Sequence, residues 1–136
     1  MNNKVLIFVE SRYKINRKRI KEAVDKALTD NEITSPVEVS IAVVGDRKMR
    51  DLSKKYKGED KTRNVLSFSQ NEHSADGKEI GKEWPNVDGV MRLGDIVLSF
   101  PQVIRDASRD EVFVDDKVDE LVQHGLLHLL GIEQEH

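Results

Sequence analysis

The sequence predicts one α+β domain, a small mixed four-stranded sheet with helices packed on it. Its 136 residues are enough for a single hydrophobic core. Apolar residues recur with the period of a strand in some segments and with the period of a helix in others, and these segments follow the order βαβαββαα. No internal repeat or low-complexity run divides the chain. We therefore expect residues 1–136 to form a single domain.

The first half of the chain is predicted to form two strands and two helices. A β-branched and aromatic run predicts a strand over residues 4–10, and apolar residues at helical spacing predict a helix over residues 17–31. Alternating apolar residues predict a second strand over residues 37–44. A glycine and an aspartate then offer a turn and an N-cap, so a second helix is expected to continue through residue 57.

The second half is predicted to form two more strands and two more helices. Short apolar runs predict strands over residues 64–69 and 95–99, and the polar stretch 71–88 between them is expected to form a long surface loop. A proline placed for a first turn predicts a helix over residues 101–112. An apolar stripe then predicts a final helix over residues 114–131, which ends at a glycine.

The composition restricts the chemistry and the location of the protein. Because the chain has no cysteine, any metal must be held by nitrogen and oxygen ligands. No apolar stretch approaches the roughly 20 residues that a membrane-spanning helix needs. The N-terminus lacks the long apolar core and cleavage site of a signal peptide and fits a first strand instead. These features predict a cytoplasmic protein with no membrane partner.

Charged residues are distributed unevenly along the chain. The net charge of -3 argues against a nucleic-acid partner, because lysine and arginine supply most of the affinity for phosphates. However, seven basic residues lie within residues 12–26 and eight within residues 47–63, whereas residues 106–136 carry nine acids and two basic residues. Such segregation can build one positive face on an acidic protein. The alternative is that these runs are ordinary solvated helix faces.

Two histidines of the predicted final helix suggest a metal site. His124 and His128 are four residues apart, so their imidazoles stand on one side of the helix, at the half-buried margin of its apolar stripe. Zinc accepts such ligands and keeps one position for water in catalytic sites, although nickel, copper or iron would fit the same nitrogens. Gly125 stands where H-E-x-x-H metalloproteases carry their general base, which weakens a protease interpretation. The alternative is that the two are ordinary core or surface histidines that bind no metal.

Three motifs, in matching order and separation, resemble one known family. Residues 124–131, H-G-L-L-H-L-L-G, resemble the signature H-G-x-L-H-L-x-G-Y-D-H of the YbeY family of bacterial endoribonucleases. Residues 56–68 are similar to its Y-R-G-K-D-K-x-T-[DN]-V-L-S-F, and residues 93–97 to its L-G-D-I-V. The resemblance spans roughly residues 37–131. It implies an α+β metalloprotein that cleaves single-stranded RNA, matures the 3′ end of small-subunit ribosomal RNA and takes part in ribosome quality control.

The same resemblance implies roles for individual residues. His124 and His128 would hold one zinc ion, but Gln134 occupies the position of the family's third metal histidine, and His136 follows two residues later. We expect His136 to be the third ligand and Gln134 its rival, because a glutamine carbonyl binds zinc weakly. Lys57 replaces an arginine associated with catalysis, so it is the candidate cation for the transition state. It keeps the charge but loses bidentate binding of phosphate.

The implied partners are single-stranded RNA, ribosomal RNA in particular, and the small ribosomal subunit, with no DNA partner. Two alternative functions remain open. The departures at Gln134 and Lys57 are compatible with a ribosome-associated RNA-binding protein that has lost catalysis. A metal-dependent hydrolase of another substrate is the second alternative, and Gly125 makes peptides a less favoured substrate.

Five further polar residues lie in or beside the family motifs. Lys61 and Arg63 are additional candidate cations, with a solvated loop as the alternative. Asn64 and Ser67 flank the third strand and are expected either to hydrogen-bond substrate or, more commonly, to satisfy local backbone. Asp95 follows a glycine and is expected to brace the turn into the fourth strand.

Overall fold

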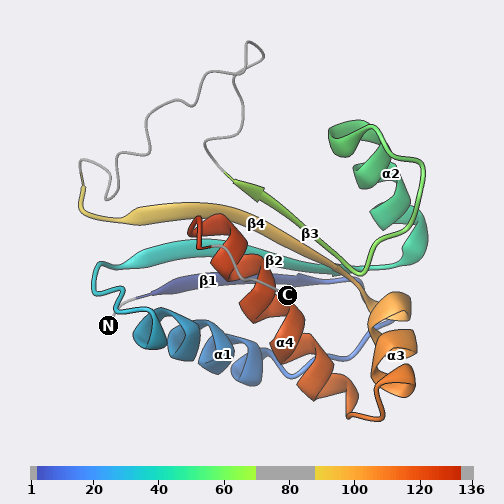
Figure 1. Cartoon of the computed structure of the whole chain (residues 1–136), viewed down its shortest axis with the longest axis horizontal. Coiled ribbons are helices and arrows are strands. Elements are labelled where there is room, and N and C mark those ends of the chain that lie inside the picture. The colour runs from blue at the N-terminus through green and yellow to red at the C-terminus, as the bar shows by residue number, and fades with distance from the viewer. Residues whose placement is uncertain (1–2, 70–87, 133–136) are drawn as a thin grey trace.

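The computed structural model describes residues 3–69 and 88–132. It confirms the predicted α+β class and the predicted order of elements (Figure 1). The elements are β1 (Lys4–Val9), α1 (Arg17–Asp30), β2 (Val37–Val44), α2 (Asp46–Lys57), β3 (Val65–Ser69), β4 (Met91–Ser99), α3 (Phe100–Arg109) and α4 (Val114–Leu129). None of the described helices combines the length and the apolar composition that a membrane span requires.

The four strands form one mixed sheet in the order β1-β2-β4-β3. β1 pairs with β2 and β2 pairs with β4 in parallel, whereas β3 pairs with β4 in the antiparallel direction. Parallel neighbours need a crossover connection, and α1 supplies the one between β1 and β2. The two edges of the sheet are therefore β1 and the short strand β3.

Helix boundaries follow from capping residues. α1 begins after Asn16, whose side-chain Oδ1 accepts a hydrogen bond of 3.0 Å from the backbone N–H of Arg19. α2 ends at Gly58, which adopts a left-handed conformation with φ of 67°. The buried positions of α1 have the spacing of an amphipathic helix, and they are Ile20, Ala23, Val24, Ala27 and Leu28.

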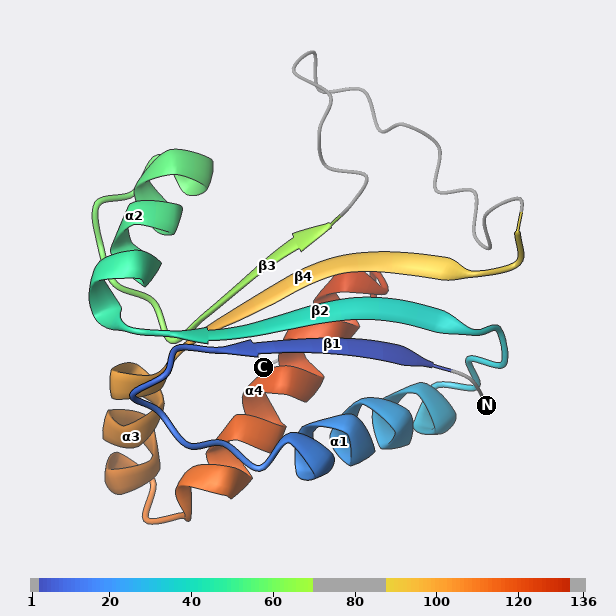
Figure 2. The same ribbon diagram turned by 180° about the vertical axis from the view of Figure 1, so that it is seen from behind.

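The two faces of the sheet are covered to different extents. On one face α1 and α4 pack against β2 and β4 and bury the main core, which includes Val24, Ile96 and Leu126. On the other face α2 packs at one side of the sheet around Met49 and Leu66. Figures 1 and 2 show α1 and α4 together below the sheet and α2 above it. Within residues 3–69 and 88–132, part of the second face is therefore not covered by a helix.

The expected start of the fourth strand was wrong. β4 begins at Met91, four residues before Asp95, and the pairing with β2 shifts between Glu38 and Val39, where Val39 pairs with Gly94. Gly94 has a φ of 126°, a conformation that favours glycine, so it forms an irregularity inside the strand. Asp95 consequently lies within β4 and does not brace a turn.

The last two helices are also shorter than expected. α3 ends at Arg109 rather than at residue 112, and the following Glu111 has a φ of 56°, which a helix does not permit. α4 ends at Leu129, two residues before Gly131, whose φ is 76°. The predicted loop over residues 71–88 lies almost wholly outside the described residues.

Candidate functional site

Helix α4 carries both candidate metal ligands on one side. His124 and His128 belong to the same helix, as predicted, and both side chains are exposed. Half burial was expected from their place beside the apolar stripe, and that expectation was wrong. The helix packs against β3 and β4 with its buried side, and the side that carries the two histidines faces solvent. Both imidazoles are therefore accessible to a ligand.

Gly125 lies between the histidines in sequence and faces the sheet. It is buried, and a Cβ atom at this position would lie 3.0 Å from Cγ2 and 3.3 Å from Cδ1 of Ile96 in β4. Such distances are shorter than ordinary van der Waals contact. The glycine thus permits close packing of α4 on β4, and a glutamate at this position would point into the core instead of toward the histidines.

A groove of about 480 Å³ lies beside His124. Asn64 and Val65, at the start of β3, form one side of it, and Glu120, Gln123 and His124 of α4 form the other. The groove therefore combines the motif of the final helix with the motif that precedes β3, although the two are about 60 residues apart in sequence. Residues from two of the three family motifs thus line the same groove.

Ser67 connects β3 to the second histidine. Its hydroxyl Oγ lies 3.3 Å from Nδ1 of His128, and its side chain is buried. A hydrogen bond at Nδ1 orients the ring and leaves Nε2 available to a metal ion, as is usual for metal-binding histidines. The interpretation of Ser67 as a residue that satisfies local backbone gives way to a contact inside the site.

Asn64 is held in the groove by a buried carboxylate. Its Nδ2 donates a hydrogen bond of 2.8 Å to Oδ2 of Asp106, and Oδ1 of Asp106 lies 3.2 Å from a guanidinium nitrogen of Arg109. Asp106 is only 7% exposed. Because the amide nitrogen faces Asp106, the orientation of the Asn64 side chain beside His124 is fixed.

Sequence reasoning missed Asp106, yet a signal was present. Val103, Asp106 and Ala107 are the buried residues of α3, and they have the spacing of its apolar stripe. An aspartate within such a stripe must find a polar partner, because an unpaired buried carboxylate is costly. The stripe therefore indicated a buried contact, although it could not identify Asn64 as the partner.

The described residues supply two suitable ligands for one metal ion, His124 and His128. Imidazole nitrogens are preferred ligands of zinc and related transition metals, and two of them lie on one exposed helix side. Within residues 3–69 and 88–132, no group of three or more histidine, cysteine, aspartate or glutamate side chains is arranged to hold a metal. Both candidates for the third ligand, His136 and Gln134, lie outside the described residues. The identity of that ligand stays a prediction.

The structure places Lys57 on the other side of β3. Its ammonium lies 5.7 Å from the centre of the Phe68 ring, and Phe68 follows Ser67 in a strand, so the two side chains point to opposite faces. Lys57 is exposed, and it pairs with no carboxylate of the described residues. Its charge remains available to an anionic ligand.

The two other candidate cations are paired with the same glutamate. Nζ of Lys61 lies 3.4 Å from Glu59, and the guanidinium of Arg63 forms both an ion pair and a hydrogen bond with Glu59. Their charges are therefore partly neutralised. Among the three candidates, Lys57 is the one without such a partner.

Comparison with known proteins identifies a consistent set of relatives. The profile of a family described as Endoribonuclease YbeY matches residues 7–136. A protein of that name from a Sulfurihydrogenibium species is 32% identical over 98% of this chain and 80% of its own length. Another from Syntrophus aciditrophicus is 34% identical over 93% of this chain and 72% of its own length.

A solved structure resembles the fold. The solution structure of a protein from Thermotoga maritima superposes with a TM-score of 0.57 and covers 96% of this chain and 75% of its own. The two sequences are 20% identical, so this likeness concerns the fold alone.

Proposed function

The chain belongs to the endoribonuclease YbeY family, and on this premise we propose that it is a metal-dependent endoribonuclease specific for single-stranded RNA. Its relatives are named endoribonucleases, and this name supports a hydrolase that acts on RNA. We propose further that it acts in the cytoplasm on the 3′ end of small-subunit ribosomal RNA and in ribosome quality control. The support for this biological role is the resemblance of its three motifs.

The observation that carries the metal proposal is the pair of accessible imidazoles on α4. His124 and His128 share one helix side, and the contact between Ser67 and Nδ1 of His128 favours a metal at the other ring nitrogen. We propose that Zn²⁺ is the ion, about one per chain, with His136 as third ligand and Gln134 as the rival. Another divalent transition metal would suit the same nitrogens.

Each residue of the candidate site has a separate role in this proposal. When bound, the ion supplies Lewis-acid chemistry and lowers the pKa of water at neutral pH. Ser67 holds the ring of His128, and the Asp106 contact keeps the Asn64 amide beside His124. Lys57 is the proposed cation for the transition state, and because its ammonium lies on the face of β3 opposite the histidines, this role requires the RNA to pass around the edge of that strand. Because β3 is an edge strand, RNA that crosses it would meet the lysine on one face and the histidines on the other.

Cleavage of a fluorescent single-stranded RNA tests the proposal. We expect the wild-type protein to contain metal by elemental analysis and to cleave the RNA, and we expect both properties to be lost in His124→Ala and His128→Ala. The exposure of both histidines predicts that these variants keep their fold, which circular dichroism checks. His73→Ala, which replaces a histidine outside the described residues, is the matched control. Wild-type protein that stays metal-free after zinc is supplied would contradict the metal proposal.

The third ligand is tested by two variants near the C-terminus. We expect His136→Ala to lose the metal and Gln134→Ala to keep it, and the opposite result would assign the ligand to Gln134. The departures at Lys57 and Gln134 also allow an RNA-binding protein that has lost catalysis. Binding of RNA by the wild-type protein without cleavage at any metal concentration would support that alternative. Cleavage of a peptide but not of RNA would support a different substrate.

A further inference from the structure

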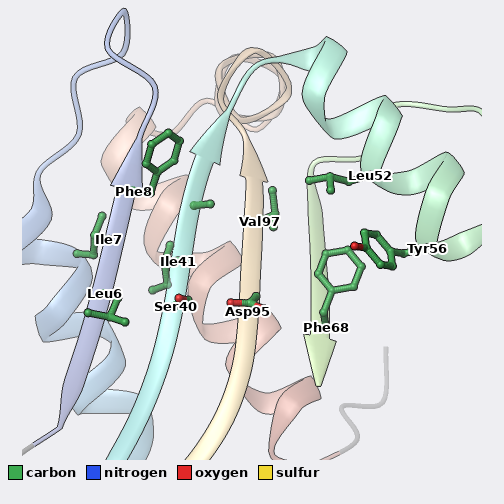
Figure 3. A pocket seen from close by; sticks show the side chains of 11 residues that line it. Leu6, Ile7, Phe8, Ser40, Ile41, Leu52, Tyr56, Phe68, Asp95 and Val97 are labelled. Atoms are coloured by element: carbon green, nitrogen blue, oxygen red, sulfur yellow. The ribbon is translucent and has the colours of Figure 1, made fainter. Parts of the chain in front are cut away.

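The open face of the sheet carries two aligned rows of side chains. The strand register places Leu6 opposite Ser40, Ser40 opposite Asp95, and Asp95 opposite Phe68. Two residues further along, the second row consists of Phe8, Ala42, Val97 and Leu66. Side chains two residues apart share a face, so the two rows form one continuous surface (Figure 3).

All residues of these rows except the buried Leu66 line a pocket of about 590 Å³. The small side chains of Ser40 and Ala42 come from the central strand β2. Tyr56 of α2 lies at the side of the pocket, next to Phe68 (Figure 3). Phe8 is 62% exposed and Tyr56 is 52% exposed. The ring of Tyr56 meets that of Phe68 edge-on, with centres 5.1 Å apart. Aromatic surfaces thus flank a hollow large enough for a flat ring.

Positive charge borders the same pocket. Nζ of Lys55 lies 5.1 Å from the centre of the Tyr56 ring, and Nζ of Lys57 lies 5.7 Å from that of Phe68. Residues 47–63 contain eight basic residues, most of them on α2. An occupant with flat aromatic groups and an anionic backbone would complement both features, and single-stranded nucleic acid has both.

The carboxylate of Asp95 would allow this pocket to discriminate between the bases of a nucleic acid. Its side chain is exposed and lines the pocket, and within residues 3–69 and 88–132 its carboxylate forms no hydrogen bond or ion pair. A carboxylate accepts hydrogen bonds and repels phosphate, so it suits the donor edge of a base. Guanine presents N1–H and the N2 amino group side by side, which matches the two carboxylate oxygens. The other bases offer no such adjacent pair of donors on one edge.

We propose that this pocket binds a guanine base of single-stranded RNA. The carboxylate of Asp95 accepts hydrogen bonds from N1–H and N2–H, Tyr56 and Phe68 contact this base, Phe8 contacts a neighbouring base, and Lys55 and Lys57 hold the adjacent phosphates. The inference rests on the proposed function and specifies the substrate of the same enzyme. Phe68 faces the pocket and Ser67 faces His128, so strand β3 has one side toward the pocket and the other toward the histidine groove.

Fluorescence anisotropy with labelled oligouridine that carries one central guanine, adenine or inosine tests the discrimination. We expect the wild-type protein to bind the guanine oligonucleotide about tenfold more tightly than the adenine one. Inosine, which lacks the N2 amino group, should fall between them. Asp95→Asn should abolish the preference. Asp51→Asn removes the same charge from an exposed position of α2 outside the pocket and should keep it.

A second pair of variants tests the aromatic contribution. Phe8→Ala should weaken binding of all these oligonucleotides about five- to tenfold, because the loss of stacking does not depend on the base. Phe113→Ala is the matched control, since Phe113 is 81% exposed and lies outside the pocket. Because both residues are highly exposed, we expect both variants to keep their fold, which circular dichroism checks.

The outcomes separate this inference from the proposed function. If RNA cleavage is intact but the wild-type protein shows no guanine preference, or if Asp95→Asn and Asp51→Asn behave alike, the pocket assignment fails and the enzyme assignment stands. If the protein neither binds nor cleaves RNA, both fail. Self-association in analytical ultracentrifugation that Phe8→Ala abolishes, or binding of an arginine-rich peptide that only Asp95→Asn abolishes with RNA affinity unchanged, would assign this face to a protein and overturn the inference.

Discussion

Ser67 shows how a single side chain of the sheet can tune a helix-borne ligand. Its hydroxyl is buried and lies 3.3 Å from Nδ1 of His128. α2 contains a second buried serine, Ser53, whose hydroxyl has no hydrogen-bond partner among the described residues. The two serines share a residue type and a degree of burial but differ in whether they touch the site, so they form a natural comparison.

Replacement of Ser67 by alanine should weaken metal binding. We expect the Zn²⁺ affinity of Ser67→Ala to fall about tenfold, since loss of a contact that orients a metal-binding histidine usually has an effect of this size. Ser53→Ala should leave the affinity unchanged. Competition with a chromogenic chelator measures both variants, and equal affinities for Ser67→Ala and wild type would remove Ser67 from the site.

The site was only partly predictable because its residues differ in how local their signals are. His124 and His128 follow from helical spacing alone. The contact between Asn64 and Asp106 joins residues 42 apart, and it depends on how β3, β4 and α3 meet. The place of Asp95 on the open face depends on a register set by pairing with β2. No local pattern encodes either relation.

At the scale of elements, the packing of α4 on β4 decides where the histidines stand. Gly125 meets Ile96 at the closest point of this contact. Two effects oppose each other when a methyl group is added here. Alanine favours a helix by about 1 kcal/mol over glycine, whereas overpacking of a core costs about 1–3 kcal/mol. The short distance of 3.0 Å to Cγ2 of Ile96 indicates that overpacking is the larger effect.

Gly125→Ala should therefore lower the free energy of unfolding by about 1 kcal/mol in net terms. Urea denaturation of the metal-free protein measures this change. In the Ile96→Ala background the added methyl group has room, so the same substitution should be neutral or stabilising there, as a double-mutant cycle detects. The same loss in both backgrounds would show that Ile96 is not the cause.

An ionic cluster around a buried lysine links the end of α3 to the start of α4. Lys117 is 3% exposed, and its ammonium donates hydrogen bonds of 2.6 Å to Asp110 and 2.9 Å to Glu120. Arg109 also binds Asp110, at 2.9 Å. The hydrogen bond from Arg109, followed by that from Lys117, holds the pKa of the Asp110 carboxyl well below its ordinary value. The cluster thus joins the end of α3 to the first turns of α4.

This cluster predicts a loss of stability in acid. A carboxyl whose pKa is lowered in the folded state stabilises the protein above its unfolded pKa, near 3.8, and loses this contribution as the pH falls below that value. The difference in urea midpoint between wild type and Asp110→Asn should therefore shrink from pH 5 to about pH 2. Asp51→Asn controls for the loss of one charge. A difference that does not vary with pH would contradict the assignment to Asp110.

At the scale of the whole molecule, the two basic segments, residues 12–26 and 47–63, differ in how far acidic residues neutralise them. Arg19 of α1 pairs with Asp116 and with Asp119 of α4, at 2.7 Å in the second case, so part of the basic charge of α1 is neutralised by the acidic final helix. α2 lies on the opposite face of the sheet (Figure 2), and none of the described helices that packs against it is acidic. Of the two interpretations of the charge pattern, a positive face therefore applies best to α2.

The salt dependence of RNA binding should follow this division. The logarithm of affinity falls with the logarithm of salt concentration by about 0.7 for each phosphate contact with a single strand. Lys54→Ala/Lys55→Ala in α2 should reduce this slope, whereas Lys18→Ala/Lys21→Ala in α1 should leave it unchanged. Anisotropy titrations at salt concentrations from about 50 to about 300 mM measure this slope. Equal effects of the two double variants would show that both helices contact RNA.

The order of elements was predictable because each strand and helix has its own apolar period. The boundaries of β4 and α3 were not, because a sheet irregularity at Gly94 and a left-handed residue at Glu111 set them. The assignment of residues 1–136 to one domain stays a prediction.

The position of α4 has a consequence for synthesis of the protein. This helix is the last of the described elements to leave the ribosome, and it supplies Val122 and Leu126 to the main core as well as the two histidines. A nascent chain that still lacks α4 exposes the apolar side of β2 and β4 and has no pair of imidazoles. Folding of the main core and assembly of the proposed nuclease site therefore both depend on α4, so neither can be completed before this helix has been synthesised.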